Sequence, residues 1–231
     1  MKKKPFHFPM LVYERVIGIL YIPVHAFLLP LLLVLLATFA DWNLDDATLN
    51  LVYYAFSALF LLLAMNRYWR TTIRDLTSAP FRALQAVILG YVIFFIVNYA
   101  FTLITSLFLK NPVNPNTAAV NESMAINSDM MIVVMVLLAP IVEETMFRGA
   151  LFGAIRQKSR LLAYAASTLL FALYHLWGYS FRDLSILIYA VQYIPASIAL
   201  AWCYEQSGTL TAPVVLHALI NLIGAINIVW R

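Results

Sequence analysis

The sequence predicts an all-α fold, a polytopic bundle of transmembrane helices. The chain has 231 residues, of which 63% are hydrophobic and 11% charged, whereas a soluble globular domain carries about 25% charged residues. Several apolar runs reach the roughly 20 residues that a helix needs to cross a bilayer. A transmembrane β-barrel would instead need short segments of alternating hydrophobicity, which this sequence does not contain.

Seven apolar segments follow one another along the chain, and each is predicted to be one span. They cover about residues 16–40, 48–65, 83–109, 130–155, 161–178, 185–204 and 209–230. Pro23 and Pro30 interrupt the first segment, so the number of spans rises to eight if these prolines divide it. That segment is too long for the apolar part of a signal peptide, and no clear small-x-small cleavage site follows it. We therefore interpret it as a retained span.

A polar stretch separates the spans into two groups. Residues 110–129, KNPVNPNTAAVNESMAINSD, form the longest polar stretch, and their Asn-Pro pairs predict turns. The stretch divides residues 1–110, with three spans and no recognisable motif, from residues 130–231, with four spans that carry the motifs described below.

The basic residues predict how the bundle is oriented in the membrane. They gather before the first span and in every second loop, as Lys2, Lys3, Lys4, Arg15, Arg67, Arg70, Arg74, Arg82, Arg156, Lys158 and Arg160. The loops in between carry three aspartates or a single basic residue, namely Asp41, Asp45, Asp46, Lys110 and Arg182. Because cytoplasmic loops are enriched in lysine and arginine, the N-terminus is predicted to be cytoplasmic and the C-terminus to lie outside.

Charge and cysteine content exclude other classes of function. The net charge is +4, but the basic residues are not gathered with stacking aromatic side chains on one surface, so no nucleic-acid partner is expected. The single cysteine, Cys203, excludes an internal disulfide and a zinc site built mainly on thiolates.

The fourth segment contains three charges at membrane depth, in the stretch APIVEETMFRG at 139–149. Ionisable residues there are unfavourable and mark functional sites by default. Glu144 and Arg148 stand four residues apart on one helix face, with the glutamate first, which is the favourable order. We interpret them as a supporting ion pair, since a bidentate pair would satisfy both charges.

Glu143 has no such partner, because Phe147 stands four residues after it. Its side chain points about 100° around the helix from that of Glu144. A carboxyl without a charged partner in a low-dielectric site suits a general base or acid that works near neutrality. The alternative, on this segment alone, is a protonated Glu143 that hydrogen-bonds a neighbouring helix.

Two further segments offer polar groups at mid-depth. The fifth contains FALYHLW, in which Phe171 and His175 share a face, and the seventh contains PVVLHALIN, in which His217 and Asn221 share a face. A glutamate, two histidines and an asparagine supply a base, its orienting partner and donors for an oxyanion. His25, in the first segment, has no motif around it and is interpreted as a packing residue.

The three motifs EETMFR, FALYH and HALIN together resemble those of the CPBP family, the CAAX proteases and bacteriocin-processing enzymes. These are intramembrane glutamic endopeptidases related to CAAX prenyl protease 2. The family pattern is Glu-Glu-x-x-x-Arg, then Phe-x-x-x-His, then His-x-x-x-Asn, and here the motifs occur in that order on three different segments. The resemblance covers about residues 130–225.

The resemblance implies a site and a reaction. Its catalytic residues would be Glu143, His175, His217 and Asn221. The first two would activate a water, the last two would stabilise an oxyanion, and the ion pair and Phe171 would support them. The implied reaction is hydrolysis of a peptide bond in a membrane-associated or lipidated peptide or protein, either a CAAX-type C-terminal tail or a bacteriocin-related peptide.

Two alternatives remain at this level. Glu143, His175 and His217 could bind zinc with water as a fourth ligand. The sequence lacks HExxH, and the resemblance favours a metal-free mechanism, so no cofactor is expected. The chain could also be a non-proteolytic membrane protein or a carrier with a polar midplane site, although no inverted repeat is visible.

The sequence and the resemblance lead us to expect an integral protein of a bacterial or archaeal plasma membrane, whose partners are membrane lipid and a peptide or lipidated protein. The active site is expected to open toward the cytoplasm or laterally to the bilayer. On the predicted topology, His175 is expected to lie nearer the outside than Glu143. The sequence carries no signal for an oligomeric state.

Overall fold

The computed structural model describes residues 6, 8–107, 114–181 and 183–229, and within these ranges its regular structure is helical, without a β-strand. Seven helical segments are long and apolar enough to cross a membrane. They cover Val12–Phe39, Asp46–Ala64, Pro80–Ser106, Ser128–Arg156, Arg160–Ser180, Leu184–Ser207 and Thr211–Ile228. The prediction of an all-α transmembrane bundle is confirmed, and each of these segments overlaps one of the seven predicted spans.

The first span is continuous despite its prolines. Helix α1 (Val12–Pro23) passes through a π-helical turn, Val24–Leu28, into α2 (Leu29–Phe39). The wider turn follows directly on Pro23, whose ring cannot donate a backbone hydrogen bond. The prolines therefore do not divide this segment, and no eighth span is found among the described residues.

Helices α3 (Asp46–Ala64), α4 (Asn66–Ser78) and α5 (Pro80–Ser106) complete the N-terminal group. The side chain of Asp45 caps α3 by accepting a hydrogen bond from the backbone N–H of Thr48 at 2.8 Å. Helix α4 is short and amphipathic and carries the arginine-rich sequence, so it lies across the end of the bundle and is not a span. Only the first part of α5 is buried.

The polar stretch after α5 contains a helix, α6 (Pro115–Ile126), within the segment from which turns were expected. Asn114 caps this helix by accepting from the backbone N–H of Thr117 at 2.8 Å. Pro115 occupies the first turn, where its missing N–H removes no intrahelical hydrogen bond. The Asn-Pro pair therefore marks a helix start.

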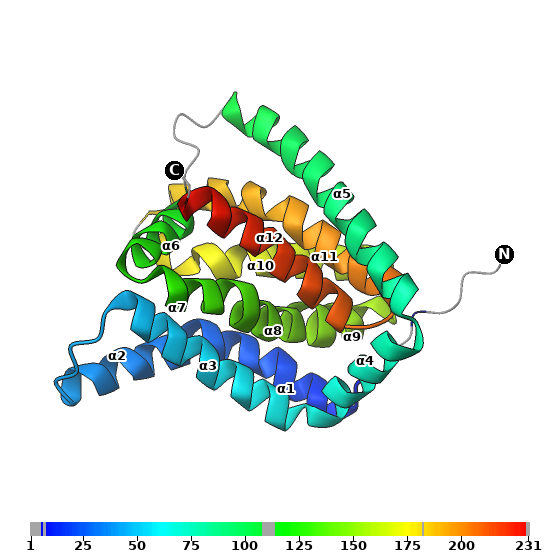
Figure 1. Cartoon of the computed structure of the whole chain (residues 1–231), viewed down its shortest axis with the longest axis horizontal. Helices are drawn as coiled ribbons and strands as arrows, with labels where there is room; N and C mark the ends of the chain where they lie inside the picture. The colour runs from blue at the N-terminus through cyan, green and yellow to red at the C-terminus, as the bar shows by residue number, and fades with distance from the viewer. Residues whose placement is uncertain (1–5, 7, 108–113, 182, 230–231) are drawn as a thin grey trace.

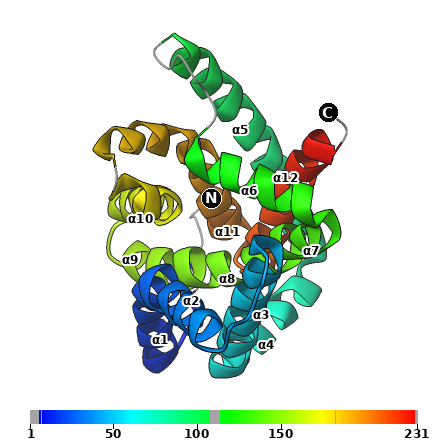
Figure 2. The same cartoon turned by 90° about the vertical axis from the view of Figure 1, so that its left-hand side faces the viewer.

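The fourth span is the central element of the bundle. It consists of α7 (Ser128–Val133), a π-helical turn (Val134–Leu138), α8 (Ala139–Glu144), a π-helical segment (Thr145–Phe152) and α9 (Gly153–Arg156). Figures 1 and 2 show it between α1 and α3 on one side and the C-terminal helices on the other. Its apolar window is 56% buried, against 28% or less in the other spans. The charged residues in the middle of this span, Glu143, Glu144 and Arg148, consequently face protein, not lipid.

The C-terminal helices α10 (Arg160–Ser180), α11 (Ile194–Ser207) and α12 (Thr211–Val229) pack beside the central span, and a 3-10 helix (Leu184–Tyr193) leads into α11. On the opposite side, α1 lies close against the π-helical segment. A Cβ atom at Gly18 would lie 2.5 Å from the Cβ of Ala150, so glycine permits this approach.

The arginine-rich loops meet at one end of the bundle, which Figure 1 shows around α4. Three sets of contacts join them. Arg67 forms an ion pair with Glu14, and Arg156 and Arg160 form ion pairs with Glu205. Arg82 donates a hydrogen bond to the carbonyl oxygen of Gln206. The α2–α3 loop and α6 lie at the opposite end. Five of the basic residues used to predict the orientation, Lys2, Lys3, Lys4, Lys110 and Arg182, lie outside the described residues. Which end faces the cytoplasm stays a prediction.

Candidate active site

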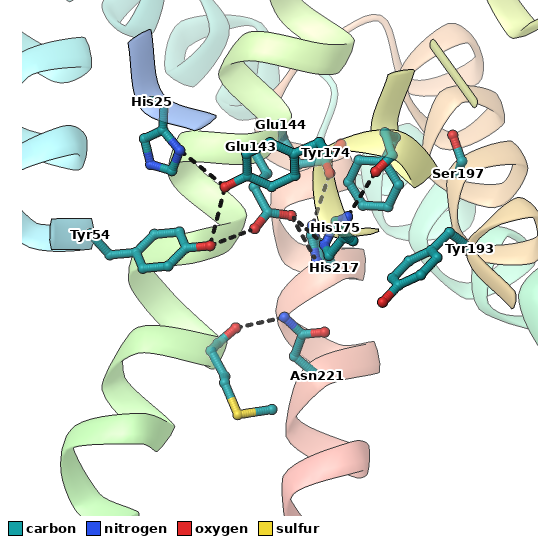
Figure 3. A network of polar contacts seen from close by, with 12 residues as sticks. His25, Tyr54, Glu143, Glu144, Tyr174, His175, Tyr193, Ser197, His217 and Asn221 are labelled. Carbon is teal, nitrogen blue, oxygen red and sulfur yellow. Dashed lines mark hydrogen bonds and ion pairs between the residues drawn. The ribbon is translucent and has the colours of Figure 1, made fainter. Parts of the chain in front are cut away.

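The structure brings Glu143, His175 and His217 together from α8, α10 and α12 (Figure 3). Oε2 of Glu143 lies 3.7 Å from Nε2 of His175 and 3.9 Å from Nε2 of His217. The three side chains are between 4% and 15% exposed. Residues far apart in the sequence thus form one small cluster that is almost fully buried inside the bundle.

The expected difference in depth between Glu143 and His175 is not observed. Both residues lie about four helical turns from the loop that joins Arg156 to Arg160. The two spans have 29 and 21 residues. Because the longer span extends further beyond Glu143 than the shorter one extends beyond His175, the distance to the far span end does not measure the relative depth of these residues.

Each histidine is held through its Nδ1 atom. Nδ1 of His175 lies 2.8 Å from the carbonyl oxygen of Phe171, and Nδ1 of His217 lies 2.9 Å from Oε1 of Glu144. A carbonyl or carboxylate oxygen accepts, so both Nδ1 atoms carry the hydrogen. In a neutral ring each Nε2 is then an acceptor, and both Nε2 atoms face Oε2 of Glu143. Three acceptor atoms close together repel one another, so a proton, a water or a cation between them is needed for stability.

Glu144 and Arg148 form a fully buried ion pair, with 3.0 Å between Oε1 and Nη1. Nη2 of Arg148 also donates to Ser197, at 3.1 Å to Oγ and 3.3 Å to the carbonyl oxygen. The guanidinium carbon lies 4.3 Å from the ring centre of Phe171, whose ring also packs against that of His175. Phe171 therefore links the ion pair to the histidine.

The charges of this cluster do not cancel when both histidines are neutral. With both carboxyls ionised, Glu143 and Glu144 would place two negative charges beside one guanidinium, that of Arg148. Buried charges are stable when they are balanced. The cluster is consequently suited to hold one additional proton, which the facing atoms of Glu143, His175 and His217 could exchange.

Asn221 is not brought into this group. Its Nδ2 donates to the backbone carbonyl of Met135 at 2.8 Å, within the π-helical turn Val134–Leu138. Figure 3 shows it on α12 apart from the histidines and Glu143. In this arrangement Asn221 ties α12 to the central span.

Tyr54 and Tyr174, which stand in none of the predicted catalytic positions, also contact the site. The Tyr54 hydroxyl, on α3, donates to Oε1 of Glu143 at 3.2 Å. The Tyr174 hydroxyl lies 3.3 Å from that of Tyr54 and 3.0 Å from Nδ1 of His25, which is also 2.6 Å from the Tyr53 hydroxyl. His25 is thus part of a hydrogen-bonded chain that ends at Glu143, beyond the packing role expected of it. The adjacent pair Tyr53-Tyr54 was the only local signal.

A cavity of about 460 Å³ borders the cluster. Tyr54, Tyr174 and His175 line it, and it extends to Asp46 at the start of α3 and to Tyr179 near the end of α10. These two positions lie at the end of the bundle away from the arginine-rich loops (Figure 1). The expected opening was toward the cytoplasm or laterally to the bilayer, and which of these the cavity provides stays a prediction.

The same cluster offers the donor types that zinc prefers, two imidazole nitrogens and a carboxylate. Ligands of a tetrahedral zinc stand about 3.4 Å apart, so the separations of 3.7 and 3.9 Å would have to contract by a few tenths of an ångström. As the described side chains stand, no group of three His, Cys, Asp or Glu residues is arranged to hold a metal ion. Metal dependence stays open to experiment.

Comparisons with known proteins agree with the motifs. Residues 126–223 match the family described as Type II CAAX prenyl endopeptidase Rce1-like. The UPF0177 protein YxdF of Lactococcus lactis subsp. lactis (strain IL1403) is 31% identical over 88 residues, which are 38% of this chain and 44% of the relative. The match therefore covers less than half the length of that curated relative. No solved structure matches the chain.

The family match spans the central helix, α10, α11 and the part of α12 that carries His217. It includes every side chain of the cluster except Tyr54 and the other residues from the first three spans. Residues 126–223 are therefore similar to the Rce1-like type II CAAX prenyl endopeptidases, which are a family of proteases.

Proposed function

We propose that this protein is an intramembrane endopeptidase that hydrolyses a peptide bond of a membrane-associated peptide, with Glu143 as the base that activates a water. The observation that carries the proposal is the approach of Glu143 Oε2 to the Nε2 atoms of His175 and His217 inside the bundle. Oε2 of Glu143 and Nε2 of His175 accept hydrogen bonds, as the two hydrogens of a bound water require.

In the first step the water oxygen attacks the carbonyl carbon of the peptide bond while Glu143 takes a proton from the water. Tyr54 supports this step, because its hydrogen bond to Oε1 leaves Oε2 facing the histidines. His175, fixed by the Phe171 carbonyl, would accept the second hydrogen of the water and so orient it.

The resulting oxyanion needs a hydrogen-bond donor. His217 can donate from Nε2 only as an imidazolium, because its Nδ1–H is directed to Glu144. The carboxylate of Glu144 stabilises that imidazolium, as a buried carboxylate does in other hydrolases. The additional proton that balances the cluster would then reside on His217. Asn221 stays a predicted second donor, and to act it would have to release the Met135 carbonyl.

In the second step the proton on Glu143 passes to the nitrogen of the leaving amine. The carbon–nitrogen bond breaks, and the oxyanion collapses to a carboxylic acid that still carries the second hydrogen of the water. This acid gives its proton to the released amine, and the two peptide products separate as carboxylate and ammonium. The balance of atoms is that of hydrolysis, one water consumed for each bond broken.

The test uses the purified full chain reconstituted in lipid vesicles, with a panel of prenylated and unprenylated peptides and mass spectrometry of the products. Wild type is expected to cleave at least one peptide, whereas Glu143→Ala and His175→Ala are expected to lose cleavage. Glu122→Gln, which alters an exposed acid on α6, is the matched control and should cleave like wild type. Cleavage that survives both alanine substitutions would refute the site. Solute or ion flux without cleavage would favour a carrier.

A further inference from the structure

The cavity beside the cluster has two different walls. Helix α2 contributes the apolar residues Pro30, Leu33 and Val34, and α3 and α6 contribute the polar side chains of Asn50 and Asn116. The neighbouring leucines of α2, such as Leu31, Leu32 and Leu35, are exposed on the surface of the bundle, where lipid would lie. The cavity thus joins the lipid-facing helix α2 to the reacting atoms, since His175 lines it and contacts Glu143.

The distribution of charge indicates which side of the membrane the cavity faces. Described lysines and arginines cluster at the end that carries α4, and the end that the cavity reaches carries acids, namely Asp41, Asp45, Asp46, Glu122, Asp129 and Asp183. Because basic loops are retained in the cytoplasm, the acidic end is predicted to be the outer one.

The charge of the lining restricts the substrate. The only carboxylate among the described lining residues is Asp46, and none of them is lysine or arginine. A peptide that ends two or three residues after the cleaved bond would place its C-terminal carboxylate near this cavity, where the described lining offers no lysine or arginine to pair with it. Such a terminal anion is disfavoured there, and an uncharged internal segment is not.

From these observations, and resting on the proposed protease function, we infer that the cavity receives an internal segment of a membrane-anchored peptide from the non-cytoplasmic side. The anchor would lie along α2 in the lipid, and the polypeptide would pass between Asn50 and Asn116 to reach Glu143. The substrate class is therefore an exported or outer-leaflet peptide cut away from its C-terminus, which differs from a cytoplasmic C-terminal tail.

Gly178 permits a direct test of the cavity. It lines the cavity on α10, and a Cβ atom there would meet no other atom within 4 Å, as is also true at Gly224 on α12, which does not line it. Gly178→Leu is expected to lower kcat/KM at least about tenfold by filling the passage, and Gly224→Leu should stay within about twofold of wild type. Both variants should unfold at or above the wild-type temperature, since leucine favours a helix more than glycine. Cleavage by Gly178→Leu at the wild-type rate would overturn the inference.

The side of entry can be tested without any cleavage. In a Cys203→Ala background, Asn50→Cys is expected to react with a membrane-impermeant maleimide added to intact cells, whereas the exposed control Arg74→Cys should react only in inverted vesicles. The opposite pattern would overturn the assigned side while leaving the protease function standing. Absence of cleavage in detergent, where both sides are accessible, would instead refute the protease function and this inference with it.

The substrate class is tested with the best peptide of the panel in two forms. In one, the cleaved bond lies in the middle of the peptide, and in the other the peptide ends three residues later with a free carboxylate. The first is expected to be cleaved at least about tenfold faster. Asp46→Asn should raise cleavage of the second about two- to fivefold, and Asp41→Asn, an exposed acid that does not line the cavity, should not. A preference for the free C-terminal carboxylate would overturn the assignment.

Discussion

Replacing Glu144 by glutamine is expected to destabilise the protein, whereas the same change at Glu143 should abolish cleavage and leave the fold intact. Oε1 of Glu144 lies 3.0 Å from Arg148 Nη1 and 2.9 Å from His217 Nδ1, and the side chains of the ion pair are fully buried. Glutamine keeps the shape but removes the charge, so the guanidinium of Arg148 loses its counter-ion in a dry environment.

Breaking a buried ion pair by removing one partner costs about 3–5 kcal/mol. The glutamine oxygen still accepts one hydrogen bond, so we expect the lower value, about 3 kcal/mol. For a protein of this size that corresponds to a fall of roughly 6–12 °C in the unfolding temperature. Among the described residues, Glu143 accepts a hydrogen bond from Tyr54 and has no ion pair with a lysine or arginine. Glu143→Gln should therefore cost about 1 kcal/mol or less and reduce kcat about 10³-fold.

The assay combines thermal unfolding in detergent with the cleavage rate for each variant. Arg148→Met completes a double-mutant cycle with Glu144→Gln, and removing both charges should restore at least about 2 kcal/mol relative to the sum of the single changes. An unchanged unfolding temperature for Glu144→Gln would refute the role of the ion pair. Cleavage by Glu143→Gln within tenfold of wild type would refute its role as the base.

Three further predictions follow from the contacts. Tyr54→Phe removes the hydrogen bond to Glu143 and should lower kcat about tenfold with little change in KM. The two constants are measured with a cleaved peptide of the panel, and an effect on KM alone would contradict the role of Tyr54 in positioning Glu143. Protein stripped of zinc with a chelator is expected to keep full activity, and a loss restored by zinc alone would contradict the metal-free mechanism. Gly18→Ala should lower the unfolding temperature, because its methyl group would lie 2.5 Å from the Cβ of Ala150. Gly224→Ala, where a methyl group would meet no atom within 4 Å, should not lower it. Equal unfolding temperatures for the two variants would show that α1 moves to accommodate the methyl group.

Local sequence patterns predicted those parts of the structure that depend on local geometry. The spans follow from runs of apolar residues, and the contact between Glu144 and Arg148 follows from a spacing of four residues on one helix face. The assembly of Glu143 with the two histidines was expected from their similar depth on three segments and from the family resemblance, since no local rule fixes which helices meet.

Contacts that depend on tertiary packing were beyond the sequence. Tyr54 touches Glu143 because α3 packs against α8, and neither residue carries a sign of the other in its local sequence. Asn221 shares a helix face with His217, yet one turn further along α12 it meets the π-helical turn at Met135. The position of the cavity depends on how α2, α3, α6 and α10 diverge, and hydropathy does not determine that.

The assembly of the active site from separate spans has a consequence for the lipid around it. Tyr54, Glu143, His175 and His217 come from four spans, and the candidate spans range from 18 to 29 residues in length. Helices of unequal length respond to a change in hydrocarbon thickness by tilting to different extents. Such tilts would alter separations of 3.7 and 3.9 Å without any change in sequence, pH or substrate. The bilayer would then act as a regulator of the enzyme, and its rate in vesicles should pass through a maximum as the acyl-chain length is varied.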